Sequence, residues 1–117
     1  MSLINRAAIE NLKDLEEKTG QNLIANLSKL YIDTTPDILK KMELSFNNKM
    51  FETLSNEAHS LKSSSANIGA HDIANICQSI ESMITTQTSF SEDKIKSLLI
   101  EINDIYPKIL AELKAYT

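Results

Sequence analysis

Tryptophan is absent from this 117-residue chain, and glycine and proline occur only twice each. A fold with many tight turns uses these two residues often, so their scarcity argues against a loop-rich protein or a multi-stranded β fold. No segment alternates apolar and polar residues over the length of a strand. The residue types that dominate are Leu, Ile, Lys, Glu, Ser and Asn. Together these features favour an all-α protein.

Other absences exclude classes of partner and location. The single cysteine, Cys77, cannot form an intramolecular disulfide, which is compatible with a reducing cytoplasm. No apolar run approaches the ~18 residues of a membrane span, and no signal peptide is visible. The net charge of −4 gives no reason to expect nucleic acid or an anionic membrane as a partner. We therefore expect a cytoplasmic protein.

The length suits one hydrophobic core that buries roughly two thirds of the unfolded surface. We expect a single domain over residues 1–117, with a monomer as the default. The opening Met1-Ser2-Leu3 is either native or a cloning remnant. If it is a remnant, the domain comes from a larger protein.

Apolar residues at helical spacing predict two helices in the first part of the chain. The first runs from about Ile4 to Lys18, and Gly20 is placed to end it in a left-handed cap. The second begins near residue 21 or 22 and meets Pro36. This proline either kinks a continuous helix or starts a new one with Thr35 as its N-cap.

Two further helices follow the turn signal at residues 47–49. The first spans about Met50 to Asn67 and is closed by Gly69. Asp72 is the expected N-cap of the next helix, and the polar run Thr85–Ser89 is the expected loop after it.

The last helix has two candidate start points. Ser89 heads a capping box with Glu92, and Ser91 competes as the N-cap. Pro107 predicts a kink or break near Tyr106. The combined expectation is an antiparallel four-helix bundle with an additional N-terminal helix packed on it.

One histidine occupies an unusual face of the helix predicted over residues 50–67. At about 100° per residue, His59 lies opposite the apolar stripe of this helix. The residues near it are small or polar, with one cation: Ser55, Lys62, Ser63 and Ala66. Such a face leaves the imidazole open to solvent and to a partner. A neutral imidazole is a usable nucleophile at cellular pH, so the pattern suits transient phosphorylation on nitrogen.

A longer motif surrounds this histidine. His59-Ser-Leu-Lys62 is followed by Ser63-Ser-Ser-Ala-Asn-Ile-Gly-Ala70, and then by Ile73, Cys77 and Ile80-Glu81. It resembles the histidine-containing phosphotransfer (HPt) domain of multistep two-component relays. That family's motif is roughly H-x-L-K-G-S-S-x-x-x-G-A, followed by a small residue or Cys and a closing Leu/Ile-Glu/Gln. This chain departs from the motif at Ser63, where the family usually has glycine.

The resemblance implies a role for each matching residue. His59 is the phospho-acceptor, Lys62 offsets the charge of the phosphoryl group, and Glu81 hydrogen-bonds the other ring nitrogen. Gly69 forms the turn after the site helix. The resemblance also favours one long kinked helix across Pro36. The residues expected to contribute to a docking surface are Leu54, Ser55, Ala58, Ser63 and Ala66.

The resemblance further implies the partners. Response-regulator receiver domains, phosphorylated on aspartate and carrying Mg²⁺, would exchange the phosphoryl group with His59. The domain itself would bind no cofactor and, lacking a nucleotide-binding motif, would have no ATP-dependent kinase activity. It would be either a free cytoplasmic protein or a domain of a hybrid sensor histidine kinase, which would then act in cis on the cytoplasmic side of a membrane.

Other chemistry fits the residues poorly. A di-iron carboxylate bundle needs inward Glu-x-x-His pairs, and the chain has none. Zinc needs several converging ligands, which two histidines and one core cysteine do not provide. The remaining alternative is a helical adaptor that is not phosphorylated, in which His59 is an ordinary surface histidine and Glu81 an exposed glutamate. His71 carries no motif, and we interpret it as a surface residue.

Overall fold

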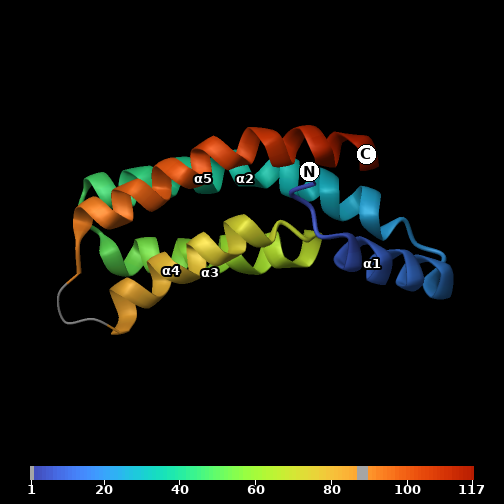
Figure 1. Cartoon of the computed structure of the whole chain (residues 1–117), viewed down its shortest axis with the longest axis horizontal. Helices are drawn as coiled ribbons and strands as arrows, with labels where there is room; N and C mark the ends of the chain where they lie inside the picture. The colour runs from blue at the N-terminus through green and yellow to red at the C-terminus, as the bar shows by residue number, and fades with distance from the viewer. Residues whose placement is uncertain (1, 87–89) are drawn as a thin grey trace.

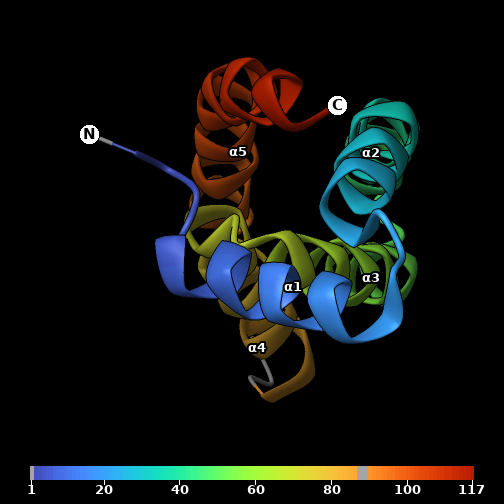
Figure 2. The same cartoon turned by 90° about the vertical axis from the view of Figure 1, so that its right-hand side faces the viewer.

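The computed structural model describes residues 2–86 and 90–117. In this part the chain is helical without strands, and the four longer helices form an antiparallel bundle (Figure 1). The chain as a whole measures 48 × 24 × 24 Å. The first helix packs at the end of the bundle where the third helix joins the fourth (Figure 2). The predicted fold is confirmed. The elements are α1 (Arg6–Thr19), α2 (Leu23–Asn47), α3 (Phe51–Ile68), α4 (His71–Thr86), α5 (Glu92–Leu113) and the 3₁₀ turn η1 (Lys114–Tyr116).

The segment before α1 is tied to the α3–α4 connection. Asn5 donates its backbone N–H to the carbonyl of Gly69 at 2.8 Å, and its side chain caps α1 by accepting from Ala8 N at 3.1 Å. Ile4 is buried but precedes the helix, which therefore begins later than the apolar spacing predicts. The spacing identified the buried residue correctly, whereas the cap decided where the helix starts.

α2 continues through its proline. Pro36 has no N–H to donate to the carbonyl of Ile32, four residues earlier. The hydroxyl of Tyr106 on α5 donates to that carbonyl instead, through a long hydrogen bond of 3.5 Å. The continuous helix is confirmed, and the alternative of a new helix capped by Thr35 is wrong. α5 likewise continues through Pro107, so the chain does not break there.

A tight turn joins α3 to α4. Gly69 has a φ of +85°, its N–H donates to Ala66 O at 3.1 Å, and Ala70 N donates to Ser65 O at 2.8 Å. This pair of bonds is a Schellman motif, which satisfies the last carbonyls of α3. α4 then begins at once, so Asp72 lies in its first turn and the expectation that it is the N-cap is wrong.

The end of α4 differs from expectation, whereas the start of α5 agrees with one of its two candidates. α4 extends through Thr86, so the predicted loop does not begin at Thr85, whose hydroxyl donates to the carbonyl of Glu81 at 2.7 Å. The rest of that loop and Ser89 lie outside the described residues. Ser91 caps α5, and its hydroxyl accepts a first-turn N–H at 3.2 Å.

The core runs along the centre of the bundle. Tyr31 on α2 and Ser65 on α3 are both buried, and their hydroxyls form a hydrogen bond of 2.8 Å between the two helices. This bond satisfies two polar groups that burial would otherwise leave unpaired. The largest fully buried apolar side chains are Met42, Leu54, Leu61, Ile68, Ile73, Ile80, Ile95, Ile102, Ile109 and Leu113.

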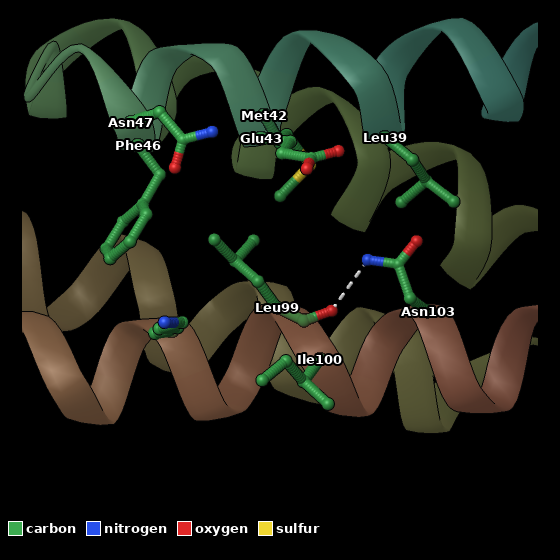
Figure 3. A pocket seen from close by; sticks show the side chains of 9 residues that line it. Leu39, Met42, Glu43, Phe46, Asn47, Leu99, Ile100 and Asn103 are labelled. Atoms are coloured by element: carbon green, nitrogen blue, oxygen red, sulfur yellow. Dashed lines mark hydrogen bonds between the residues drawn. The ribbon is translucent and has the colours of Figure 1, made fainter.

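A groove of about 240 Å³ lies between α2 and α5 (Figure 3). Leu39, Phe46 and Leu99 are among its apolar walls, and all of its lining residues belong to those two helices. It is therefore separate from α3 and α4, which carry the motif around His59. No helix in the described ranges has the length and apolar character needed to cross a membrane.

The two glycines with positive φ provide a test of the α3–α4 turn. A Cβ at Gly69 would lie 3.1 Å from Ala8 Cβ and 3.2 Å from Asn5 O, whereas a Cβ at Gly20, where φ is +71°, meets nothing within 4 Å. Both alanine substitutions impose a left-handed strain of about 1–2 kcal/mol. We expect Gly69→Ala to lower the free energy of unfolding in urea by more than Gly20→Ala does. Equal losses would show that the N-terminal segment does not restrict this position.

Candidate functional site

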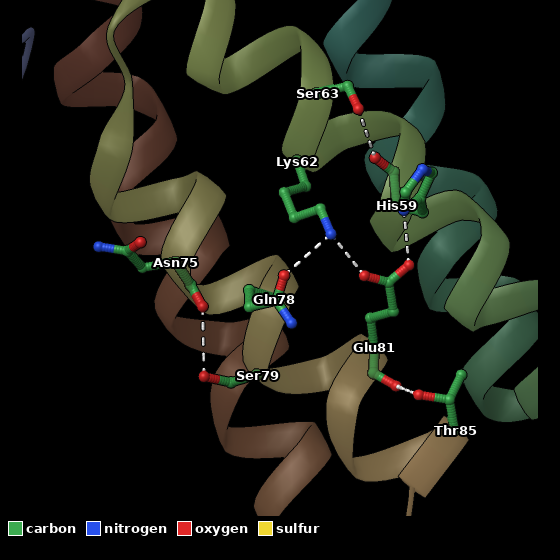
Figure 4. Close-up of polar contacts among 8 residues, drawn as sticks. All are labelled: His59, Lys62, Ser63, Asn75, Gln78, Ser79, Glu81 and Thr85. Carbon is green, nitrogen blue, oxygen red and sulfur yellow. Dashed lines mark hydrogen bonds and ion pairs between the residues drawn. The ribbon is translucent and has the colours of Figure 1, made fainter.

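His59 projects from α3 with 60% of its side chain exposed. Its Nδ1 lies 2.6 Å from Oε2 of Glu81, on α4 (Figure 4). An ionised carboxylate can only accept a hydrogen bond, so Nδ1 carries a proton and donates. In the neutral imidazole the lone pair is then on Nε2, which forms no hydrogen bond within the described part of the chain. The contact defines which nitrogen can act as a nucleophile.

Lys62 lies one turn after His59 and is largely covered, with 24% of its side chain exposed. Its Nζ donates to Oε1 of Glu81 at 2.6 Å and to Oε1 of Gln78 at 2.9 Å (Figure 4). The two oxygens of Glu81 therefore bridge the imidazole and the ammonium group. Two helices are needed for this arrangement, since α3 supplies both nitrogen groups and α4 supplies both acceptors.

The bridge alters the acidity of Glu81. The hydrogen bond from Lys62, and after it the bond from His59, lowers the pKa of the Glu81 carboxyl despite the opposing effect of partial burial. The carboxylate consequently stays ionised at neutral pH. Burial has the reverse consequence at Cys77, where it raises the pKa of the thiol to about 12. That thiol is protonated at cellular pH and is a poor candidate for redox chemistry.

The surface beside His59 is made of small side chains. Ser63 and Ala66 are exposed on α3, one and two turns after the histidine. The hydroxyl of Ser63 donates to the carbonyl of His59 at 3.3 Å, so it is turned back toward its own helix. The imidazole therefore lies on a surface that a second protein can approach closely. Within the described ranges, no group of three or more His, Cys, Asp or Glu side chains is arranged to hold a metal ion.

Comparison with known protein families identifies the chain. A family model described as Hpt domain matches residues 26–114, which is well over half of the sequence. The chain belongs to the Hpt domain family. Comparison with curated proteins and with solved structures gives no match.

Family membership establishes the general function of this Hpt domain. The family serves phosphotransfer in two-component signalling, and its members interact with receiver domains in phosphorelays. The matched range begins within α2 and ends after α5, so it contains the four-helix bundle and the bridge on Glu81. Helix α1 lies outside it and is an addition at the end of the bundle.

Three residues predicted to contribute to docking cannot contact a partner in this Hpt domain. Leu54, Ser55 and Ala58 are buried, with at most 5% of each residue exposed. Ser55 lies on the same side of α3 as Lys62, two turns earlier, and on that side Lys62 contacts α4. The angular positions of residues around a single helix do not show how much of its polar face a neighbouring helix covers. The exposed face of α3 is therefore narrower than the sequence suggests.

Sequence reasoning missed Gln78 altogether. The sequence feature that could have identified it is its place on α4, one turn before Glu81, because this spacing puts both side chains on one face of that helix. The structure brings them together on Lys62. By contrast, His71 is exposed at the start of α4 and has no part in this network.

Removing the ammonium group tests the electrostatics of the bridge. Lys62→Met is expected to raise the pKa of Glu81 toward the ordinary glutamate value, because Lys62 is the largest cause of its lowering. The stability that depends on ionised Glu81 is present above that ordinary value of about 4.3 and is lost as the pH falls through the lowered one. Carbon-13 NMR titration of the carboxyl measures the shift, with the exposed Lys40→Met as control. An unchanged Glu81 titration in Lys62→Met would contradict this account.

Proposed function

We propose that this Hpt domain is a phosphohistidine carrier. His59 accepts a phosphoryl group from the phosphorylated aspartate of one receiver domain and passes it to the aspartate of another. The observation that carries this proposal is the contact of 2.6 Å between Nδ1 of His59 and Glu81, which leaves Nε2 as the nucleophile on an exposed ring. The exposed ring is what a nucleophile that must meet a second protein requires, whereas the hydrogen bonds of Glu81 do not themselves depend on that exposure.

The proposed transfer is a displacement at phosphorus. The lone pair of Nε2 forms the N–P bond, and the P–O bond to the receiver's aspartate breaks, so that the carboxylate leaves with the electron pair. The proton on Nδ1 stays between the ring and Glu81, whose negative charge stabilises the phosphorylated imidazolium. In the second transfer a receiver carboxylate attacks phosphorus, the P–N bond breaks, and its electron pair returns to Nε2.

Lys62 supplies positive charge beside the transferring group. In this proposal the receiver carries the Mg²⁺ needed for the transfer, and the Hpt domain binds no cofactor. A receiver docks over the exposed part of α3, at His59, Ser63 and Ala66. A pocket of about 180 Å³ between α2 and α3, lined in part by Leu30 and by Ser64 beside that face, offers an adjoining apolar contact. We place the domain in the cytoplasm, as a monomer.

The carrier role is tested by phosphorylation. The wild-type domain is incubated with a panel of phosphorylated receivers, and acid-labile, base-stable phosphate is measured on the protein. We expect label on the wild type and none on His59→Gln, because this substitution removes the nucleophile. His71→Gln is the matched control, since it removes the other histidine of the chain and leaves the network intact. Label that persists on His59→Gln would show that another residue accepts the phosphoryl group and would contradict the assignment of His59. No label from any receiver on folded protein would favour the unphosphorylated adaptor.

The departure from the family motif at Ser63 gives a separate test. Ser63→Gly removes the side chain beside the imidazole and its bond to the His59 carbonyl. We expect a loss in stability of at most about 1 kcal/mol, from the helix propensity of glycine, and a transfer rate equal to or above that of the wild type. Ser60→Gly, at an exposed serine of the same helix, controls for that propensity. A large loss of transfer in Ser63→Gly alone would instead show that the hydroxyl takes part directly.

A further inference from the structure

Within the described residues, Lys62 donates hydrogen bonds to two side chains, Glu81 and Gln78, and the motif gives a role to the first but not to Gln78. It is exposed on α4, and its Oε1 accepts a hydrogen bond of 2.9 Å from Lys62 Nζ. The other acceptor of that ammonium group is Oε1 of Glu81 at 2.6 Å (Figure 4). Lys62 is therefore held from two positions on α4, by one neutral and one charged oxygen.

The two acceptors affect the ammonium group differently. Glu81 divides its charge between Lys62 and His59, through one oxygen each. Gln78 holds Lys62 without cancelling any of its positive charge. A lysine ammonium has three N–H groups, and these contacts use two of them. The third remains available, and a single carboxylate separates the ammonium from the imidazole ring.

We propose that Gln78 is a positioning residue for phosphoryl transfer at His59. It restrains the flexible Lys62 side chain so that its third N–H can reach a phosphoryl group bonded to Nε2. A free lysine side chain has considerable rotamer entropy, part of which would otherwise be lost in the transition state. This inference rests on the proposed function, because it concerns the same nucleophile.

An activity measurement that needs no receiver separates the two proposals. Phosphoramidate is a small-molecule donor: its P–N bond breaks, ammonia leaves, and Nε2 of His59 forms the new N–P bond. The rate of this reaction is followed by phosphorus-31 NMR on the full chain. The variants are Gln78→Ala, Lys62→Met and the double variant, with Asn75→Ala as control. Asn75 is an exposed amide one turn earlier on α4 whose side chain does not contact Lys62.

We expect Gln78→Ala to slow phosphorylation by about two- to tenfold, which is the net effect of one hydrogen bond on a rate. Because Gln78 acts through Lys62, the same substitution should have no further effect in the Lys62→Met background. Asn75→Ala should leave the rate unchanged. This non-additivity distinguishes positioning from a general effect on the fold, which would slow both backgrounds equally.

Three results would overturn the inference. The first is a wild-type rate of phosphorylation in Gln78→Ala. The second is that Gln78→Ala slows phosphorylation by the same factor in the wild-type and Lys62→Met backgrounds. A wild-type chain that takes no phosphoryl group from phosphoramidate would overturn this inference and the carrier function together, since His59 would then be no nucleophile. Failure of every receiver to donate, with normal labelling by phosphoramidate, counts against the carrier function alone.

Discussion

The turn at Gly69 is the constraint on which the site depends. Its left-handed conformation closes α3 and allows α4 to start within two residues, so the two helices lie antiparallel in one fixed register. That register decides that Glu81 and Gln78, rather than residues a turn away, face His59 and Lys62. The same turn receives the N-terminal segment through the hydrogen bond from Asn5. A substitution at Gly69 is therefore expected to affect both the geometry of the site and the packing of α1.

The network is held by charge rather than by burial. His59 is mostly exposed, whereas Lys62 and Glu81 are largely covered but not fully buried. A buried arrangement would strengthen the ion pair, but it would close the imidazole to a partner. An exposed ring and an ammonium group that keeps some exposure are consistent with a module that completes its site only when another protein docks. The carboxylate between them keeps the ring oriented in the meantime.

Much of the fold was predictable from local pattern. Helical spacing located the five α-helices of the described residues and the buried Ile4, and the left-handed caps at Gly20 and Gly69 follow from glycine chemistry. The errors concern helix ends and the expected break at Pro107. The backbone partner at Pro36 was also beyond local reasoning. The carbonyl freed by Pro36 is bonded by Tyr106, which lies 74 residues from Ile32, and no local pattern contains that information.

The sequence by itself determined the helical class, the motif around His59 and the helix faces on which His59, Lys62 and Glu81 lie. These depend on residue type and on spacing within one helix, both of which are given directly by the amino-acid sequence. Only the tertiary structure decided that Glu81 bridges the other two, that Gln78 joins them, and that Ser55 and Ala58 are covered. Those outcomes depend on the rotation and register of α4 against α3, and such relations between two helices are not encoded in the periodicity of either one.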